Sequence, residues 1–346
     1  MVPGINSPSM RLPVFCFVVV CLLASVRGAE PQGQGEGRKA KGDGATTEPF
    51  FKKGDVIALV GGEDMVVASE YGYLEMFLVG ALPDYQLRFR DLAREGDTVF
   101  EQPRDLNFPT WEEQFDKIGA TVVICQFGKM EGLAGKEKLP EFIAAYEKLV
   151  ERLQGGGKRR VVLLAPSRLA KWNSTTGLNA EPDPAGYGKA IEDLAIGAKI
   201  TWIPALGLAS IHDGGHLTAA DQFREAFQTS VKLAAFKPVA LASRRPLGGD
   251  SDMGGIVQIN SSGAITDSPS HQQLHSAIVA KNKLWFNYWR VQNWAFLAGD
   301  RTNQPSSRDW RDPSKRWFPA EHEEFLPLIE AKEKEIDALA AKLAGK

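Results

Sequence analysis

The stretch "DVIALVGGEDMVV" (residues 55–67) decides the fold. Residues 55–60 are mostly aliphatic, which is typical of a strand that is buried on both faces. Gly61 and Gly62 then allow a tight turn, and a helical pattern of apolar residues begins at Met65. This order of strand, glycine turn and helix predicts the first unit of an α/β sheet, with Glu63 presented at the carboxyl end of the first strand.

The same alternation continues along the chain, because short apolar runs are separated by segments with helical spacing. Strands are expected at residues 55–60, 86–91, 120–126, 160–164 and 199–204, and helices at 65–82, 111–118, 139–153, 184–198 and 218–235, the last capped by Thr218. Strands that are apolar on both faces and separated by helices form parallel sheets. Residues 50–236 are therefore predicted to form a three-layer, doubly wound, flavodoxin-like α/β domain with five parallel strands.

The N-terminus has the layout of a secretory signal. Arg11 precedes an apolar run at residues 14–24, and small residues lead to a cleavage point before Ala29. The run is too short to span a membrane comfortably, although an uncleaved anchor is the alternative. Residues 1–28 are thus predicted to be a signal peptide and residues 29–49, rich in Gly and Lys, a disordered linker. The mature protein is expected to be exported, periplasmic or secreted, with no membrane span.

The bulk composition is that of an ordinary globular protein. Its net charge is -2, its hydrophobic fraction 43% and its charged fraction 24%, so nothing indicates nucleic acid or an anionic membrane as a partner. Cys16 and Cys21 leave with the signal, so Cys125 alone remains and no internal disulfide can form.

Residues 237–346 differ in character from the α/β domain. Residues 237–268 contain strand-like pieces broken by Gly and Ser and predict an inserted hairpin or irregular loop, and residues 321–344 predict an amphipathic helix that packs on the domain. Between them lies an aromatic-rich segment with five tryptophans: Trp285, Trp289, Trp294, Trp310 and Trp317. We expect these side chains mainly to cover one wall of the domain, while Trp289 and Trp294 are candidates for stacking on a sugar at the rim of the site.

Candidate chemistry lies in four short segments, since ligands of open α/β sheets bind at the carboxyl ends of the strands. The segments are "LVGGED", "REGDTV", "CQFGKMEG" and "IHDGGHLT". In the last, Asp213 stands three residues before His216, and a glycine turn between them lets the carboxylate orient the imidazole. We expect all four segments to meet at one edge of the sheet.

These four segments resemble the motif blocks of the SGNH/GDSL hydrolase family, specifically exported relatives with long C-terminal extensions. The resemblance covers residues 53–236 and continues more loosely through "KNKLWFNYWRVQNWAFLAGDR". It implies an SGNH-type fold and hydrolysis of acyl esters by a serine nucleophile. For an exported member, acetyl groups on carbohydrate are the implied substrates.

The first block departs from the family pattern at the nucleophile. Gly61 matches the family's first glycine, Gly62 its aspartate and Glu63 its serine. Without a hydroxyl at position 63, His216 has nothing to deprotonate and no acyl-serine can form. Loss of a triad member removes a factor of about 10⁴ or more from the rate.

The remaining blocks are matched in part. Gly96 matches the second-block glycine and Gly128 the third-block glycine, while Met130 replaces the asparagine that would help to stabilise the oxyanion. Loss of such a donor costs about 10² to 10³ in turnover. Asp213 and His216 match the pair that activates serine. The resemblance and its gaps together favour a ligand-binding or accessory protein that takes a small-molecule or carbohydrate ester.

Several alternatives remain open at the level of sequence. A hydrolase could use Glu63, an activated water or a metal with Asp213 and His216, although nearby carboxylates would hold the imidazole in its protonated form. Ser69 is expected to lie inside the following helix, beyond reach of His216. An assembly component that docks through the aromatic segment is a third possibility.

A metal centre is not predicted, and neither is any cofactor. His212, Asp213, His216 and Glu63 offer imidazole and carboxylate ligands for zinc or manganese, but "HDGGH" lacks the spacing of a helical metal motif. His271 and His275, four residues apart on an expected helix, are predicted to face solvent.

Overall fold

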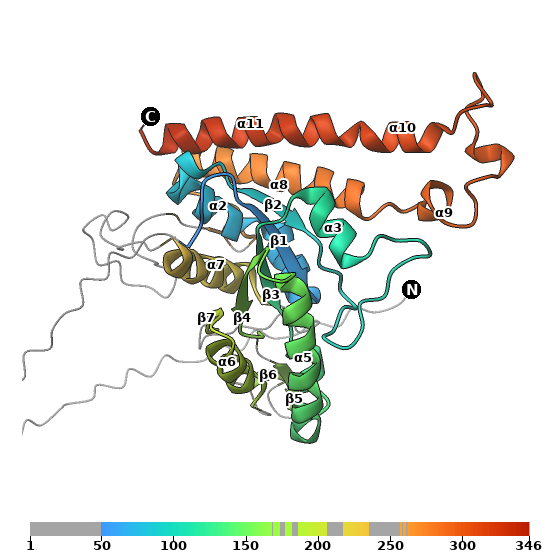
Figure 1. Ribbon diagram of the computed structural model, residues 1–346. Coiled ribbons are helices and arrows are strands. Elements are labelled where there is room, and N and C mark those ends of the chain that lie inside the picture. The colour runs from blue at the N-terminus through green and yellow to red at the C-terminus, as the bar shows by residue number, and fades with distance from the viewer. Residues whose placement is uncertain are drawn as a thin grey trace, which may run out of the picture. The chain divides into compact units, whose positions relative to one another are not determined.

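The computed structural model describes residues 50–167, 169–173, 177–181, 186–205, 217–234, 257, 259–260 and 262–345. A five-stranded parallel sheet forms the centre, in the order β2-β1-β3-β4-β7 (Figure 1). Its strands are β1 (Val56–Gly61), β2 (Arg88–Asp91), β3 (Val122–Gln126), β4 (Arg160–Leu164) and β7 (Thr201–Ile203). The predicted doubly wound α/β fold is confirmed, and each of the five expected strands is present.

The described helices connect and extend this sheet. They are α1 (Glu63–Tyr71), α2 (Tyr73–Ala81), α3 (Trp111–Ile118), α4 (Lys129–Gly132), α5 (Leu139–Gln154), α6 (Tyr187–Gly197), α7 (Ala219–Leu233), α8 (Pro269–Trp289), α9 (Trp294–Leu297), α10 (Trp317–Glu323) and α11 (Phe325–Leu343), with 3-10 turns at Pro83–Tyr85, Lys136–Lys138 and Pro305–Ser307. The hydroxyl of Thr218 accepts a hydrogen bond from the amide of Asp221 at 3.1 Å, which confirms the predicted cap of α7.

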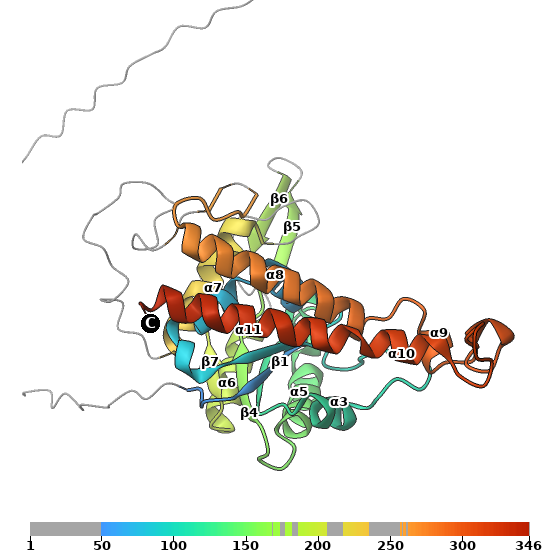
Figure 2. The same ribbon diagram turned by 90° about the horizontal axis from the view of Figure 1, so that it is seen from above.

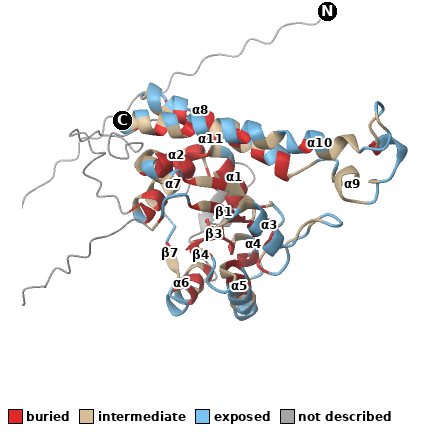
Figure 3. Ribbon diagram, turned by 45° about the horizontal axis from the view of Figure 1, so that its top comes forward, coloured by how far each residue is buried: buried red, intermediate tan, exposed pale blue. Residues whose placement is uncertain are grey.

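Alternate residues of β1, β3 and β4 contribute to two hydrophobic cores, one on each face of the sheet. Ile57 and Leu59 pack with residues of α1, α2 and α7, whereas Ala58 and Val60 pack with residues of α3, α5 and α6. Figure 3 shows buried residues (red) concentrated on the strands and on the helix faces turned toward them. Burial on both faces is what the aliphatic strand sequences predict.

Helix α8 joins both cores along the β2 edge of the sheet. Its first half contributes Leu274 and Ile278 to one core, and its last turn contributes Trp285 and Trp289 to the other. The Trp285 indole donates to the carbonyl of Asp91 on β2 at 2.7 Å, so the helix covers an edge strand. The aromatic residues at 285–289 therefore form a wall of the domain, as the packing interpretation predicts.

Ion pairs hold α8 and α11, which run side by side (Figure 2), against the rest of the fold. Lys281 of α8 is fully buried and donates a hydrogen bond to Glu75 of α2 at 2.8 Å. Asp337 of α11 forms an ion pair with Arg88 of β2 at 2.6 Å. Burial lowers the pKa of Lys281 and raises that of Glu75, in each case against the attraction of the partner.

Three expectations differ from the structure. The helix expected at 65–82 breaks at Gly72, whose φ of +66° starts α2, and a Cβ there would lie 3.0 Å from Ile278 of α8. The helix expected at 321–344 begins earlier, as α10 followed by α11. An antiparallel hairpin of β5 (Leu169–Asn173) and β6 (Gly177–Glu181) was not predicted.

Some expectations concern residues outside the described ranges, including the signal peptide and linker at 1–49 and most of the loop at 237–268. Within the described part of that loop, Ile259 and Ile265 form an antiparallel bridge. No helix in the described ranges is long and apolar enough to cross a membrane.

Candidate functional site

Gly61 and Gly62, at the end of β1, allow this strand to lie close to β3 and to the loop after β2 at the carboxyl edge of the sheet. A Cβ at Gly61 would lie 2.5 Å from the carbonyl oxygen of Gln126, so only glycine permits the observed approach of β1 to β3. A Cβ at Gly62 would lie 3.0 Å from the carbonyl oxygen of Asp97. The turn therefore sits directly against the loop that follows β2, and Glu63 begins α1 at this junction.

Glu63 lies beside a lysine rather than alone in a cleft. Its Oε2 is 4.0 Å from Nζ of Lys129, and its side chain is 30% exposed. Lys129 makes a closer contact, donating to Oδ1 of Asp64 at 2.7 Å, and Asp64 is buried. One cation is thus shared by two carboxylates in the first turn of α1, where the helix dipole also favours negative charge.

The loop after β3 supplies Gly128, Met130 and an acid that the sequence did not single out. Gly128 has a φ of +112°, and a Cβ on it would lie 3.1 Å from Ile191. Met130 is 48% exposed and brings no hydrogen-bond donor to the site. Glu131 is buried and accepts hydrogen bonds from the amides of Gly128 at 2.9 Å and Val99 at 2.8 Å. This carboxylate ties the second and third blocks together.

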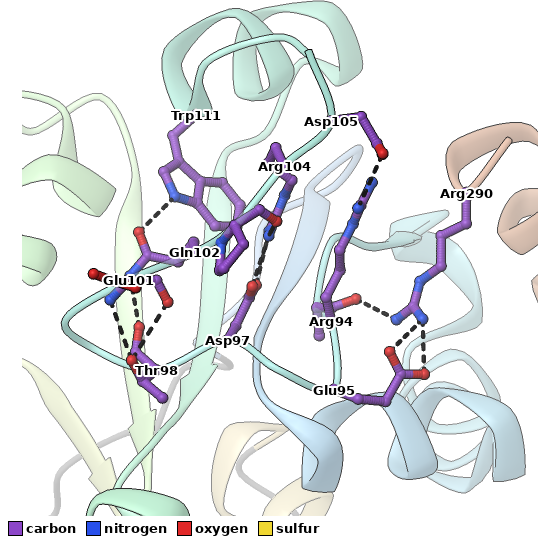
Figure 4. A network of polar contacts seen from close by, with 12 residues as sticks. Arg94, Glu95, Asp97, Thr98, Glu101, Gln102, Arg104, Asp105, Trp111 and Arg290 are labelled. Carbon is purple, nitrogen blue, oxygen red and sulfur yellow. Dashed lines mark hydrogen bonds and ion pairs between the residues drawn. The ribbon is translucent and has the colours of Figure 1, made fainter. Parts of the chain in front are cut away.

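The loop after β2 is braced from the C-terminal part of the chain (Figure 4). Arg290, at the end of α8, donates to both carboxylate oxygens of Glu95 at 2.7 and 2.8 Å and to the carbonyl of Ala93. Asp97 is buried and accepts two bonds from Arg104, at 2.6 and 2.7 Å. Burial raises the pKa of Asp97 more than the Arg104 guanidinium lowers it. Gly96 lies exposed between these two anchors, with no atom within 4 Å of its Cβ position.

The first and third blocks meet around one small cavity. Gly62, Glu63, Gly128 and Met130 all line it, and Asp97 represents the second block. Its volume is about 20 Å³, which is room for one water molecule. Glu63 and its neighbours therefore share a small, partly open cavity at the carboxyl edge of the sheet.

A second cavity of about 40 Å³ is also lined by Asp64 and is bordered by another acid that the sequence did not reveal. Glu225 of α7 lines it, together with Gln126. Burial, together with the charges of Asp64 and Asp221, raises the pKa of Glu225 to about 8, against the opposing charge of Lys129. At neutral pH this carboxyl is mainly protonated, so it can donate a hydrogen bond next to the acceptor Asp64.

The expected Asp213 and His216 pair, together with His212, lies outside the described residues. That this pair lies at the same edge of the sheet as Glu63 therefore stays a prediction. Among the residues that the structure describes, no group of three or more His, Cys, Asp or Glu side chains is arranged to hold a metal ion.

The two tryptophans proposed to bind sugar occupy packed positions. Trp289 is 6% exposed, lies parallel to Trp285 with ring centroids 5.8 Å apart, and meets Phe108 edge-on. Trp294 is half-buried and donates its indole N–H to the carbonyl of Leu106 at 2.7 Å. Neither lines the cavity beside Glu63. A sugar has no access to the ring of Trp289, because this side chain is buried.

The two histidines of α8 are partly buried, so the expectation that they face solvent is wrong. Nε2 of His275 lies 2.6 Å from the carbonyl oxygen of Tyr71, and its ring stacks on Tyr73. Nδ1 of His271 lies 2.7 Å from the hydroxyl of Ser268. Burial lowers the pKa of both rings. The contacts of His275 attach α8 to the residues at the junction of α1 and α2.

No protein-family model matches the chain, and no curated protein matches it. Among solved structures, the chain is similar to a gut microbial diltiazem-metabolizing enzyme, with a TM-score of 0.48 and 12% identity over 86% of this chain and 96% of that one. It is also similar to a protein from Parabacteroides merdae described as a GDSL-like lipase (TM-score 0.42, 13% identity, 54% of this chain, 99% of that one) and to a carbohydrate acetylesterase from Sinorhizobium meliloti (TM-score 0.36, 15% identity, 52% of this chain, 99% of that one). At these scores we base no functional conclusion on the likenesses.

Proposed function

We propose that this chain is an exported SGNH/GDSL-hydrolase-like protein that binds a small-molecule or carbohydrate ester at the carboxyl edge of its sheet without serine-esterase turnover. One observation carries the proposal: the residue presented by the turn after β1 is Glu63, whose carboxylate lies 4.0 Å from the Lys129 ammonium. A carboxylate held by a cation replaces the hydroxyl that acyl transfer to serine needs.

The surroundings of Glu63 support binding more than catalysis. Met130, on the rim, cannot donate a hydrogen bond to a developing oxyanion. Ser69, the serine nearest in sequence, is buried on α1, and its carbonyl accepts a bond from Asn282 at 2.9 Å. The cavity admits only a group of about the size of one water, such as the methyl end of an acetyl ester, so the bulk of a ligand would lie outside it.

The alternative is an active ester hydrolase that uses Glu63, an activated water or a metal together with Asp213 and His216. Glu225 is the observation that favours it. A carboxyl group whose pKa lies near the working pH can act as a general acid or base, and the pKa of Glu225 is raised to about 8.

Turnover separates the two functions. We expect the purified mature protein to hydrolyse a panel of aryl and sugar acetates no faster than buffer does. Turnover that disappears in both His216→Ala and Glu225→Gln would show an enzyme and contradict the proposal. A stoichiometric metal in freshly purified protein that is lost in Glu63→Ala would identify the water-activating route.

Binding is tested at the rim of the cavity. We expect acetylated oligosaccharides to raise the melting temperature, and Met130→Trp to abolish the effect by blocking the entrance. Leu133→Trp is the matched control. Leu133 is also exposed and lies three residues after Met130 in the sequence, but it does not line the cavity. If the ligand raised the melting temperatures of Met130→Trp and Leu133→Trp equally, it would bind at a site other than this cavity.

A further inference from the structure

The segment between α9 and α10 carries the most exposed large hydrophobic side chain in the part of the chain that the structure describes. Trp310 is 82% exposed, whereas Trp285 and Trp289 of α8 are buried. A tryptophan left in water forgoes the burial of a large apolar surface. The guanidinium of Arg311 lies 4.9 Å from the centre of its ring, yet most of the indole remains open.

The backbone around Trp310 is held in place by hydrogen bonds. Arg308 and Arg316 form an antiparallel bridge, and the amide of Asp309 donates to the carbonyl of Lys315 at 3.0 Å. Ser307 is fully buried, and its hydroxyl donates to the carbonyl of Thr302 at 2.7 Å. The exposed indole is thus presented by an ordered loop, which lowers the entropy cost of binding a ligand.

Trp310 borders a shallow hollow of about 600 Å³ that is open to solvent and is much larger than the two cavities at the sheet edge. Trp317 forms a second aromatic wall, and its indole N–H donates a hydrogen bond to the carbonyl of Ser306 at 2.9 Å. The charged side chains around the site divide evenly between donors and acceptors: Arg308, Arg311, Asp309 and Glu321.

We propose that this hollow binds a neutral pyranose unit of a glycan, stacked on Trp310. A pyranose ring has an apolar face of C–H groups and a rim of hydroxyls that both donate and accept hydrogen bonds. The exposed indole matches the face, and the guanidinium and carboxylate groups match the rim. Because two positive and two negative side chains line the site, it offers no net attraction to an acidic polymer or an anionic membrane.

The test measures dissociation constants by calorimetry with the full mature chain and three probes: cellohexaose, xylohexaose and mannohexaose. We expect at least one to bind, Trp310→Ala to weaken that binding by about tenfold or more, and Trp310→Phe to retain part of it. Leu328→Ala is the control, since Leu328 is a half-exposed apolar residue of α11 that does not line the site. Melting temperatures should stay unchanged, because both side chains are largely in solvent.

Three outcomes would overturn the proposal. None of the three oligosaccharides binds, or Trp310→Ala binds them as tightly as the wild type. Alternatively, the loop binds phosphatidylglycerol vesicles or polygalacturonate in a Trp310-dependent manner and more tightly than any neutral probe. The ester-hydrolysis and Met130 experiments report on the sheet edge, so their results do not decide this one.

Discussion

Lys129 is the residue that holds the acidic groups at the carboxyl edge of the sheet together. Its side chain is 11% exposed, and that of its closest partner, Asp64, is 8% exposed. Lys129→Met leaves the Asp64 carboxylate buried without its cation, so we expect the free energy of unfolding to fall by about 2–4 kcal/mol. Urea unfolding of this variant, of Asp64→Asn and of the double variant measures the coupling.

The coupling between Lys129 and Asp64 should be at least about 1 kcal/mol. Lys138→Met is the control, because the pair that Lys138 forms with Glu141 is exposed and contributes at most about 0.5 kcal/mol. Strictly additive effects of the two substitutions at positions 129 and 64 would show that the 2.7 Å contact does not stabilise the fold.

Glu225 should make stability depend on pH. Its pKa is raised from 4.5 to about 8 in the fold, so between these values the folded state keeps a proton that the unfolded state has lost. Wild-type stability therefore falls as pH rises through this range, by at most about 5 kcal/mol. Glu225→Gln, which stays neutral, should gain stability relative to wild type between pH 5 and pH 8.

Urea unfolding at both pH values checks the effect of Glu225. Glu147→Gln serves as the control, since Glu147 is an exposed residue of α5. A difference between wild type and Glu225→Gln that is the same at pH 5 and pH 8 would mean that the carboxyl titrates normally.

At the scale of elements, the end of α8 acts as a brace for the loop after β2. Arg290 binds Glu95 and Ala93, and the Glu95 side chain is 57% exposed, so the contact contributes little to global stability. Arg290→Ala should therefore speed amide hydrogen exchange at residues 93–97 by about tenfold while changing global stability by less than about 1 kcal/mol. Arg152→Ala, which removes an exposed pair with Glu112, should leave that loop unchanged. Unaltered exchange in Arg290→Ala would show that the loop is rigid by itself.

The elements themselves were largely predictable from the sequence. The hydrophobic periodicity and the flanking glycines predict α3 and β4 with the bounds that the structure shows. Both elements are predictable because they depend on local propensity and on the burial of their own apolar residues. The break at Gly72 was missed, since the close approach of Ile278 from α8 cannot be inferred from residues 65–82 alone. For the same reason the sequence did not single out Lys129, Glu131 or Glu225: each acquires its role from partners on other elements, up to 161 residues away in the case of Asp64 and Glu225.

At the scale of the whole molecule, the C-terminal helices belong to the same fold as the sheet. Residues of α8 enter both hydrophobic cores, and Lys281 is buried against Glu75 of α2. A chain that ends at residue 236 would expose both core surfaces and leave Glu75 buried without its cation. We expect this truncated protein to lack near-ultraviolet circular dichroism and a cooperative urea transition, whereas a chain of residues 47–346 retains both. A cooperative transition in the truncated chain would show that residues 50–236 fold independently.

The most direct test of the account is labelling with a fluorophosphonate probe, followed by intact-mass measurement and mapping of the modified residue. Glu63 stands where the turn after β1 presents its side chain, and a carboxylate there gives no stable phosphonyl-serine adduct. We predict that the wild-type protein stays unlabelled under conditions that fully label a control serine hydrolase. Stoichiometric labelling of any serine in the wild-type chain, abolished by His216→Ala, would contradict the account.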